Sequence, residues 1–66
     1  MTKTIKLSLS EDEAEIILDA LEADHEGYVE SAKEARGNNR RAEVQAFTEA
    51  AERIAAVRDR IRRELD

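Results

Sequence analysis

Two long seams of mostly apolar residues, each with the spacing of an α-helix, are the feature that most constrains how this chain can fold. The first seam consists of Ala14, Leu18, Leu21, His25, Tyr28, Ala32 and Ala35. The second consists of Val44, Phe47, Ala51, Ile54, Val57, Ile61 and Leu65. Residues at such intervals share one side of a helix, which is buried against another element. The pattern predicts two amphipathic helices, over residues 11–36 and 39–65.

The residues between the two seams predict a tight turn. Gly37 can take a left-handed C-cap without steric cost, and Asn38 and Asn39 can cap the start of the second helix. A loop this short makes neighbouring helices antiparallel. In the resulting register Tyr28 lies opposite Phe47, so the two aromatic side chains are expected to meet near the turn.

The first helix has a clear start signal. Ser10 and Glu13 have the spacing of a capping box, in which each side chain accepts a hydrogen bond from the other residue's backbone N–H. The acidic residues of this first turn also suit the positive end of the helix dipole. We therefore expect the first helix to begin directly after Ser10.

Residues 3–9 have a different period. Ile5, Leu7 and Leu9 alternate with polar residues, which is typical of a half-buried β-strand. The predicted fold is therefore mainly α: a short N-terminal β-strand followed by an antiparallel two-helix hairpin. Together they form a single strand-helix-helix domain over residues 1–66.

The size of the chain predicts association. It has 66 residues and no cysteine, and below roughly 70–80 residues a core alone rarely supplies more than ~3–5 kcal/mol. An isolated strand also leaves its backbone groups unpaired. We expect a homodimer in which Ile5, Leu7 and Leu9 belong to an intermolecular two-stranded ribbon. The two hairpins would then close into a four-helix arrangement.

The charges are unevenly distributed along this acidic chain of net charge −5. On the first helix, an acidic stripe consists of Glu15, Asp19, Glu22, Glu26 and Glu30. The stripe is interpreted as a solvated face that favours solubility, with a docking face for a basic partner as the alternative. Near the C-terminus, Arg58, Arg60, Arg62 and Arg63 are expected to lie opposite Glu11, Glu13 and Glu15, so ion pairing explains them without a ligand.

Three arginines near the turn are the candidate partner-binding residues. Arg40 and Arg41 stand at a helix start, where positive charge opposes the helix dipole. Together with Arg36 they could bind a phosphate or a carboxylate. The alternative is an exposed turn whose charge is neutralised by Glu34 and Glu43.

No catalytic or metal-binding pattern emerges. Glu22 and His25 have the Glu-x-x-His spacing of carboxylate-bridged di-iron bundles, but alanines face His25 across the hairpin. We interpret His25 as a core or interface histidine and expect no metal and no cofactor. No hydroxyl residue has this lone histidine at a local activating spacing, so we expect no enzyme.

The longest run of large apolar residues, residues 16–18, and the longest run that includes alanine, residues 54–57, are both too short for a signal peptide or a transmembrane helix. The chain is therefore expected to be soluble and cytoplasmic.

Two resemblances bear on function. The order of strand, helix, turn and helix, with the turn sequence of residues 37–44, resembles the ribbon-helix-helix DNA-binding family. That resemblance implies that Thr4, Lys6 and Ser8 would read the major groove. The segment of residues 7–15, with the heavy use of Arg and Ala, is similar to small uncharacterised accessory proteins of actinobacteria and their phages. Such proteins often act by binding a host or partner protein.

The functional expectation is a non-enzymatic protein–protein interaction module, in the manner of a small phage or bacterial accessory or regulatory protein. The alternative is a DNA-binding transcriptional regulator of the ribbon-helix-helix kind. The acidic balance ranks DNA binding second, because contact with phosphates requires a basic surface. No membrane partner is expected.

Overall fold

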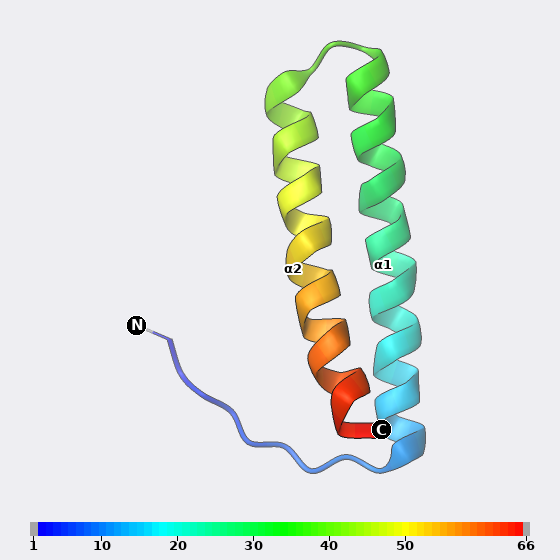
Figure 1. The fold of residues 1–66 in the computed structure, drawn as a ribbon, viewed down its shortest axis with the longest axis vertical. Coiled ribbons are helices and arrows are strands. Elements are labelled where there is room, and N and C mark those ends of the chain that lie inside the picture. Colours follow the sequence, from blue (N-terminus) through cyan, green and yellow to red (C-terminus); the bar gives the residue numbers. More distant parts are fainter. Residues whose placement is uncertain (1, 66) are drawn as a thin grey trace.

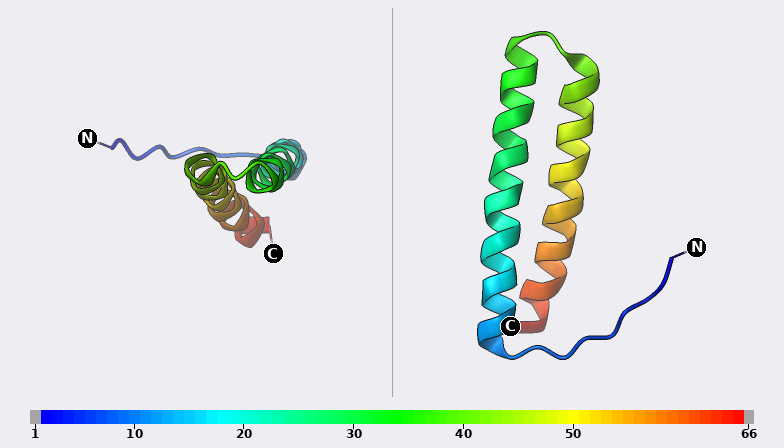
Figure 2. Two further views of the ribbon diagram at one scale, coloured as in Figure 1. Left: turned by 90° about the horizontal axis from the view of Figure 1, so that it is seen from above. Right: turned by 180° about the vertical axis from the view of Figure 1, so that it is seen from behind.

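The computed structural model describes residues 2–65, which form an antiparallel two-helix hairpin preceded by an extended arm (Figure 1). Helix α1 spans Glu11–Gly37 and helix α2 spans Arg41–Leu65. The two helices run side by side in Figure 1 and in the rear view of Figure 2, and the view from above shows α2 inclined to α1. The predicted hairpin is thereby confirmed; residues 1 and 66, the ends of the predicted domain, lie outside the described residues.

The start of α1 is the predicted capping box. The Glu13 N–H donates to Ser10 Oγ at 3.1 Å, and the Ser10 N–H donates to Glu13 Oε1 at 2.9 Å. Ser10 itself is extended, with φ −73° and ψ 164°, as an N-cap residue should be. The hydrogen bonds from the Ser10 backbone and side chain lower the pKa of Glu13. The two hydrogen bonds of the capping box satisfy the N–H groups of Ser10 and Glu13, which have no acceptor within the helix.

The end of α1 differs from the prediction. Gly37 is the last helical residue and its φ is not positive; the left-handed residue is Asn39, with φ 58°. The Asn39 N–H donates to the Arg36 carbonyl at 3.2 Å, and the Arg40 N–H donates to the Ala35 carbonyl at 2.9 Å. This is a Schellman motif, which satisfies carbonyls of the last turn. Asparagine tolerates the left-handed region, so the reversal lies two residues after the glycine.

The start of α2 is also later than predicted. The helix begins at Arg41 instead of residue 39, and the Val44 N–H donates to the Arg40 carbonyl at 3.0 Å. Arg40 therefore occupies the N-cap position. Asn38, predicted to cap α2, belongs to α1 instead: its Nδ2 donates to the Glu34 carbonyl at 3.0 Å. Both asparagines therefore stabilise the end of α1: Asn39 is the left-handed residue of the Schellman motif, and the Asn38 side chain donates to a carbonyl of the last turn.

The interface between the helices is built from small residues. The buried apolar residues are Ala14, Leu18, Ala32, Ala35 and Ala51. Larger seam residues, among them Tyr28 and Phe47, are half-buried. The rings of this aromatic pair lie 6.1 Å apart, between centroids, with planes tilted by 39°. This contact confirms the predicted register near the turn.

The predicted strand of residues 3–9 is absent from the single chain. Residues 2–10 form neither helix nor strand, and within the described residues there is no β-strand. In Figure 1 the arm runs across the open end of the hairpin and then continues away from both helices. The physical reason is that a strand needs a neighbour for its ladder of hydrogen bonds, and one chain supplies none.

Candidate functional site

The open end of the hairpin, where α1 begins and α2 ends, carries an apolar groove. We call this hollow of about 880 Å³ the open-end groove. Its apolar lining consists of Ile5, Leu7, Leu9, Ala14, Ile17, Val57, Ile61 and Leu65, and the charged residues Lys6, Arg60, Arg63 and Glu64 complete it. Arm and helices thus contribute apolar side chains to one surface, although the arm has no regular structure.

The apolar side chains of this region are largely accessible to solvent. Ile5 is 81% exposed, Leu7 is 72% exposed and Val57 is 47% exposed. The sequence places Val57 in the seam, but the single hairpin leaves half of this side chain uncovered. A patch of this kind on a small protein marks an interaction surface more often than isolated apolar residues do.

Ile16 is a large apolar residue outside the first seam, and it is 68% exposed. Both Ala14 and Leu18 are buried, and a residue two positions from each lies on nearly the opposite side of the helix. Ile17, in contrast, is half-buried and lines the open-end groove. The angle between residues around the helix axis is enough to predict that Ile17 faces α2 and that Ile16 faces solvent.

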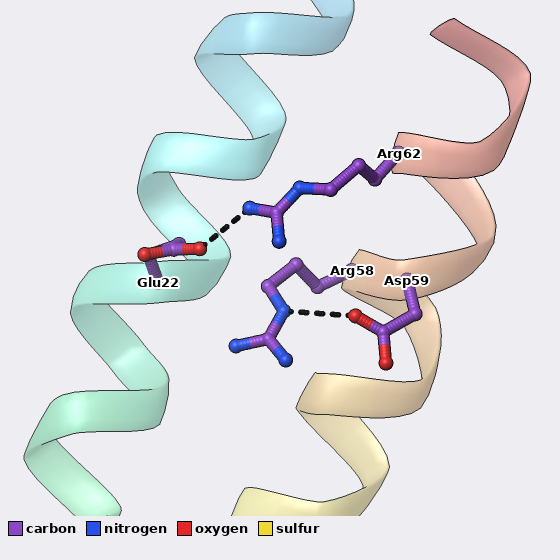
Figure 3. A network of polar contacts seen from close by, with 4 residues as sticks. All are labelled: Glu22, Arg58, Asp59 and Arg62. Carbon is purple, nitrogen blue, oxygen red and sulfur yellow. Dashed lines mark hydrogen bonds and ion pairs between the residues drawn. The ribbon is translucent and has the colours of Figure 1, made fainter. Parts of the chain in front are cut away.

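One ion pair links the two helices, and a second lies beside it within α2 (Figure 3). Arg62 donates from Nη2 to Glu22 Oε1 at 2.7 Å, and Arg58 donates from Nε to Asp59 Oδ1 at 3.2 Å. The hydrogen bond from Arg62 lowers the pKa of Glu22, and the charges of Arg62, Arg58 and His25 lower it further. Arg62 therefore pairs with a member of the acidic stripe. The predicted pairing of this arginine with Glu11, Glu13 or Glu15 is wrong.

The closed end of the hairpin brings the three predicted arginines together. Arg36, Arg40 and Arg41, which we call the arginine turn, line a hollow of about 280 Å³ with Asn39, Val44 and Gln45. Arg40 Nη1 lies 3.4 Å from Glu43 Oε2, so one of the three charges has the predicted acidic partner. Among residues 2–65, Arg36 and Arg41 form no ion pair. Two of the three guanidinium groups of the arginine turn thus have no acidic partner among the described residues.

The interior of the hairpin offers little for catalysis or metal binding. No three His, Cys, Asp or Glu side chains converge on a common point within residues 2–65. His25 is half-buried. Neither described helix has the length and apolar character needed to cross a membrane.

Comparisons of this chain with known protein families, curated proteins and solved structures find no match. A functional proposal therefore rests on the open-end groove and the arginine turn.

Proposed function

We propose that this chain is a non-enzymatic, cytoplasmic protein–protein interaction module that works as a symmetric homodimer. The observation that carries the proposal is the shared exposure of apolar side chains on the arm and on the open end of the hairpin. Ile5 and Leu7 are more than two-thirds exposed, and Val57 is nearly half exposed beside them in the groove. Covering such side chains stabilises an association by roughly 25 cal/mol per Å² of apolar area.

In the proposed dimer the arms of two protomers pair as strands and the hairpins close into a four-helix arrangement. Pairing gives each arm the hydrogen-bond partners that its own chain lacks. The second copy would cover the exposed side of Val57 and the open-end groove. A two-fold symmetric dimer is the commonest closed solution for a single surface that complements itself.

The arginine turn is the proposed contact for a partner protein. It lies at the end of the hairpin remote from the arm, so a dimer formed through the arms leaves it accessible (Figure 1). The two arginines without ion pairs, Arg36 and Arg41, suit carboxylates on the partner. Such a module fits the role of a small phage or bacterial accessory protein that regulates by binding. The acidic stripe is assigned to solubility.

Light scattering after size exclusion tests the dimer. At micromolar concentration the wild-type chain should show about twice its 7.5 kDa mass. Leu7→Asp should shift the protein towards the monomer, whereas Ser8→Asp carries the same charge on the polar side of the arm and should remain dimeric. A wild-type monomer that is folded at this concentration would overturn the proposal.

DNA binding is the second candidate, favoured by the exposed polar side of the arm, which presents Thr4, Lys6 and Ser8. Titration of mixed duplex DNA at low and high salt separates the two functions. The interaction module should bind weakly at either salt concentration because the chain carries a net charge of −5. Tight binding that weakens steeply with salt would instead support the DNA-binding regulator.

A further inference from the structure

We infer that the two arms pair antiparallel in one register, in which Leu7 of one protomer lies opposite Leu7 of its partner on the two-fold axis. This inference rests on the proposed dimer and specifies its geometry. The occupant of the open-end groove is therefore the arm of a second copy of this chain.

The apolar residues of the arm select this register. Directly opposite residues in a β-ribbon point to the same face, so shifting the register by one residue would pair apolar with polar side chains. With Leu7 on the axis, Ile5 lies opposite the partner's Leu9, and all six apolar side chains form one continuous row. A shift that places Lys6 on the axis would instead put Leu9 opposite the partner's Lys3.

The charges favour the same arrangement. With Leu7 on the axis, Lys6 lies opposite the partner's Ser8, whereas the register centred on residue 6 sets two lysines face to face. A parallel ribbon in register would do the same at Lys3 and Lys6. Like charges directly opposite destabilise a strand pair. The antiparallel register centred on Leu7 avoids both pairs.

A further complementary contact arises where the arm meets α1. Ser10 is the last extended residue, and the first turn of α1 that follows it is acidic. In the inferred register Thr4 lies opposite Ser10 of the partner subunit, so Lys3 lies just past the end of the ribbon, next to Glu11 in the first turn of the partner's α1. Glu11 is exposed and has no ion pair within residues 2–65, so it is available for the contact.

The open-end groove supplies the surface that the apolar face of the ribbon would cover. Ile5, Leu7 and Leu9 already line the groove together with Ile61 and Leu65. A second arm added beside the first would extend this apolar row across the open ends of both hairpins. In the single chain Lys6 also lines this groove. In the ribbon Lys6 and Ser8 would share the opposite, polar face, so Lys6 would leave the groove for solvent when the arms pair.

Disulfide cross-linking tests the register, because the chain contains no cysteine and one engineered thiol is therefore unique. Opposite residues have Cα atoms about 4.5–5.5 Å apart, within the roughly 4.4–6.8 Å range of disulfides. Leu7→Cys should cross-link rapidly. Lys6→Cys places its thiols on diagonal neighbours about 7–8 Å apart. Ile5→Cys is the matched control because it removes a similar apolar side chain. Its two thiols would lie about 13 Å apart along the ribbon.

We expect Leu7→Cys to cross-link at least tenfold faster than Ile5→Cys, with Lys6→Cys between them. Fastest cross-linking of Lys6→Cys, or equal rates for Ile5→Cys and Leu7→Cys, would overturn the register while the dimer remained. A dimer in which none of the three cross-links would show that the arms do not pair. A wild-type monomer in light scattering would refute the proposed function and this inference together.

Charge exchange provides a second, non-covalent test of the same register. Lys3→Glu and Glu11→Lys should each weaken the dimer by about threefold, the size typical of an exposed ion pair, and the double variant should recover. Asp12→Lys is the matched control, since it makes the same charge change in the same helical turn. If Lys3→Glu were rescued equally by Asp12→Lys, the specific pairing with Glu11 would be wrong.

Discussion

Replacing Gly37 by alanine should stabilise the hairpin, although the sequence assigns this glycine to the left-handed turn. Gly37 is the last residue of α1, its φ is not positive, and a Cβ built on it would have no neighbouring atom within 4 Å. Alanine is favoured over glycine by up to about 1 kcal/mol inside a helix, because glycine loses more backbone entropy on folding. At the end of the helix we expect about half of that, roughly 0.5 kcal/mol.

Asn39 should respond with the opposite sign. Its φ of 58° lies in the left-handed region, where a Cβ costs roughly 1–2 kcal/mol unless the side chain compensates locally. Asn39→Ala should therefore destabilise the protein by about 1 kcal/mol, and Asn39→Gly should be neutral or stabilising. The Schellman hydrogen bonds are formed by the backbone and remain possible in both variants.

Thermal unfolding followed by circular dichroism measures these differences, at one protein concentration because association shifts the midpoint. For a domain of this size 1 kcal/mol corresponds to about 4–8 °C. Gly27→Ala is the reference for helix propensity alone, since Gly27 lies inside α1 and its Cβ would also meet nothing. If Gly37→Ala lowered the midpoint and Asn39→Ala left it unchanged, the left-handed residue would be Gly37 and the structural reasoning would be refuted.

Three further changes have defined outcomes. Ser10→Ala removes an acceptor from the capping box and should cost about 1 kcal/mol in urea unfolding. The hydrogen bond from Arg62 lowers the pKa of Glu22 below its ordinary value of 4.5, so the pair stabilises the fold above pH 4.5 and this stabilisation is lost as the pH falls further. Glu22→Gln should therefore make the unfolding midpoint depend less on pH in this acid range. The double variant Arg40→Ala, Arg41→Ala should leave the thermal stability unchanged or slightly raised, and it should weaken partner binding in affinity capture from a lysate. The triple variant Glu15→Gln, Asp19→Gln, Glu22→Gln should reduce partner binding less.

The sequence predicts the two helices, their antiparallel order and the start of α1. These features depend on interactions between residues close in sequence and on the periodic spacing of apolar residues. The capping box of Ser10 and Glu13 depends on residues three positions apart, and both of its hydrogen bonds form. The contact between Tyr28 and Phe47 follows from counting residues outwards from a short turn. Neither inference requires knowledge of a distant side chain.

The remaining details depend on choices that local patterns leave open. Gly37 and Asn39 can both take a left-handed conformation, and the hydrogen bonds of the whole turn decide between them. Arg62 has a long side chain that can reach several acidic residues across the interface, so its pairing with Glu22 depends on the crossing of the helices. The strand predicted for residues 3–9 requires hydrogen-bond partners from outside the single chain.

The composition of the core connects the hairpin to the proposed dimer. Within residues 2–65, four of the five buried apolar residues are alanines, and the fifth is Leu18. Small side chains let the helices approach closely, but each removes little apolar area from water, whereas a fully buried large aliphatic side chain contributes about 1.5–3 kcal/mol. Larger residues of the same seams, such as Val57 and Ile61, remain partly exposed at the open end. Pairing of the arms would cover these residues, so association would supply apolar burial that the single hairpin lacks, and folding and assembly would be coupled.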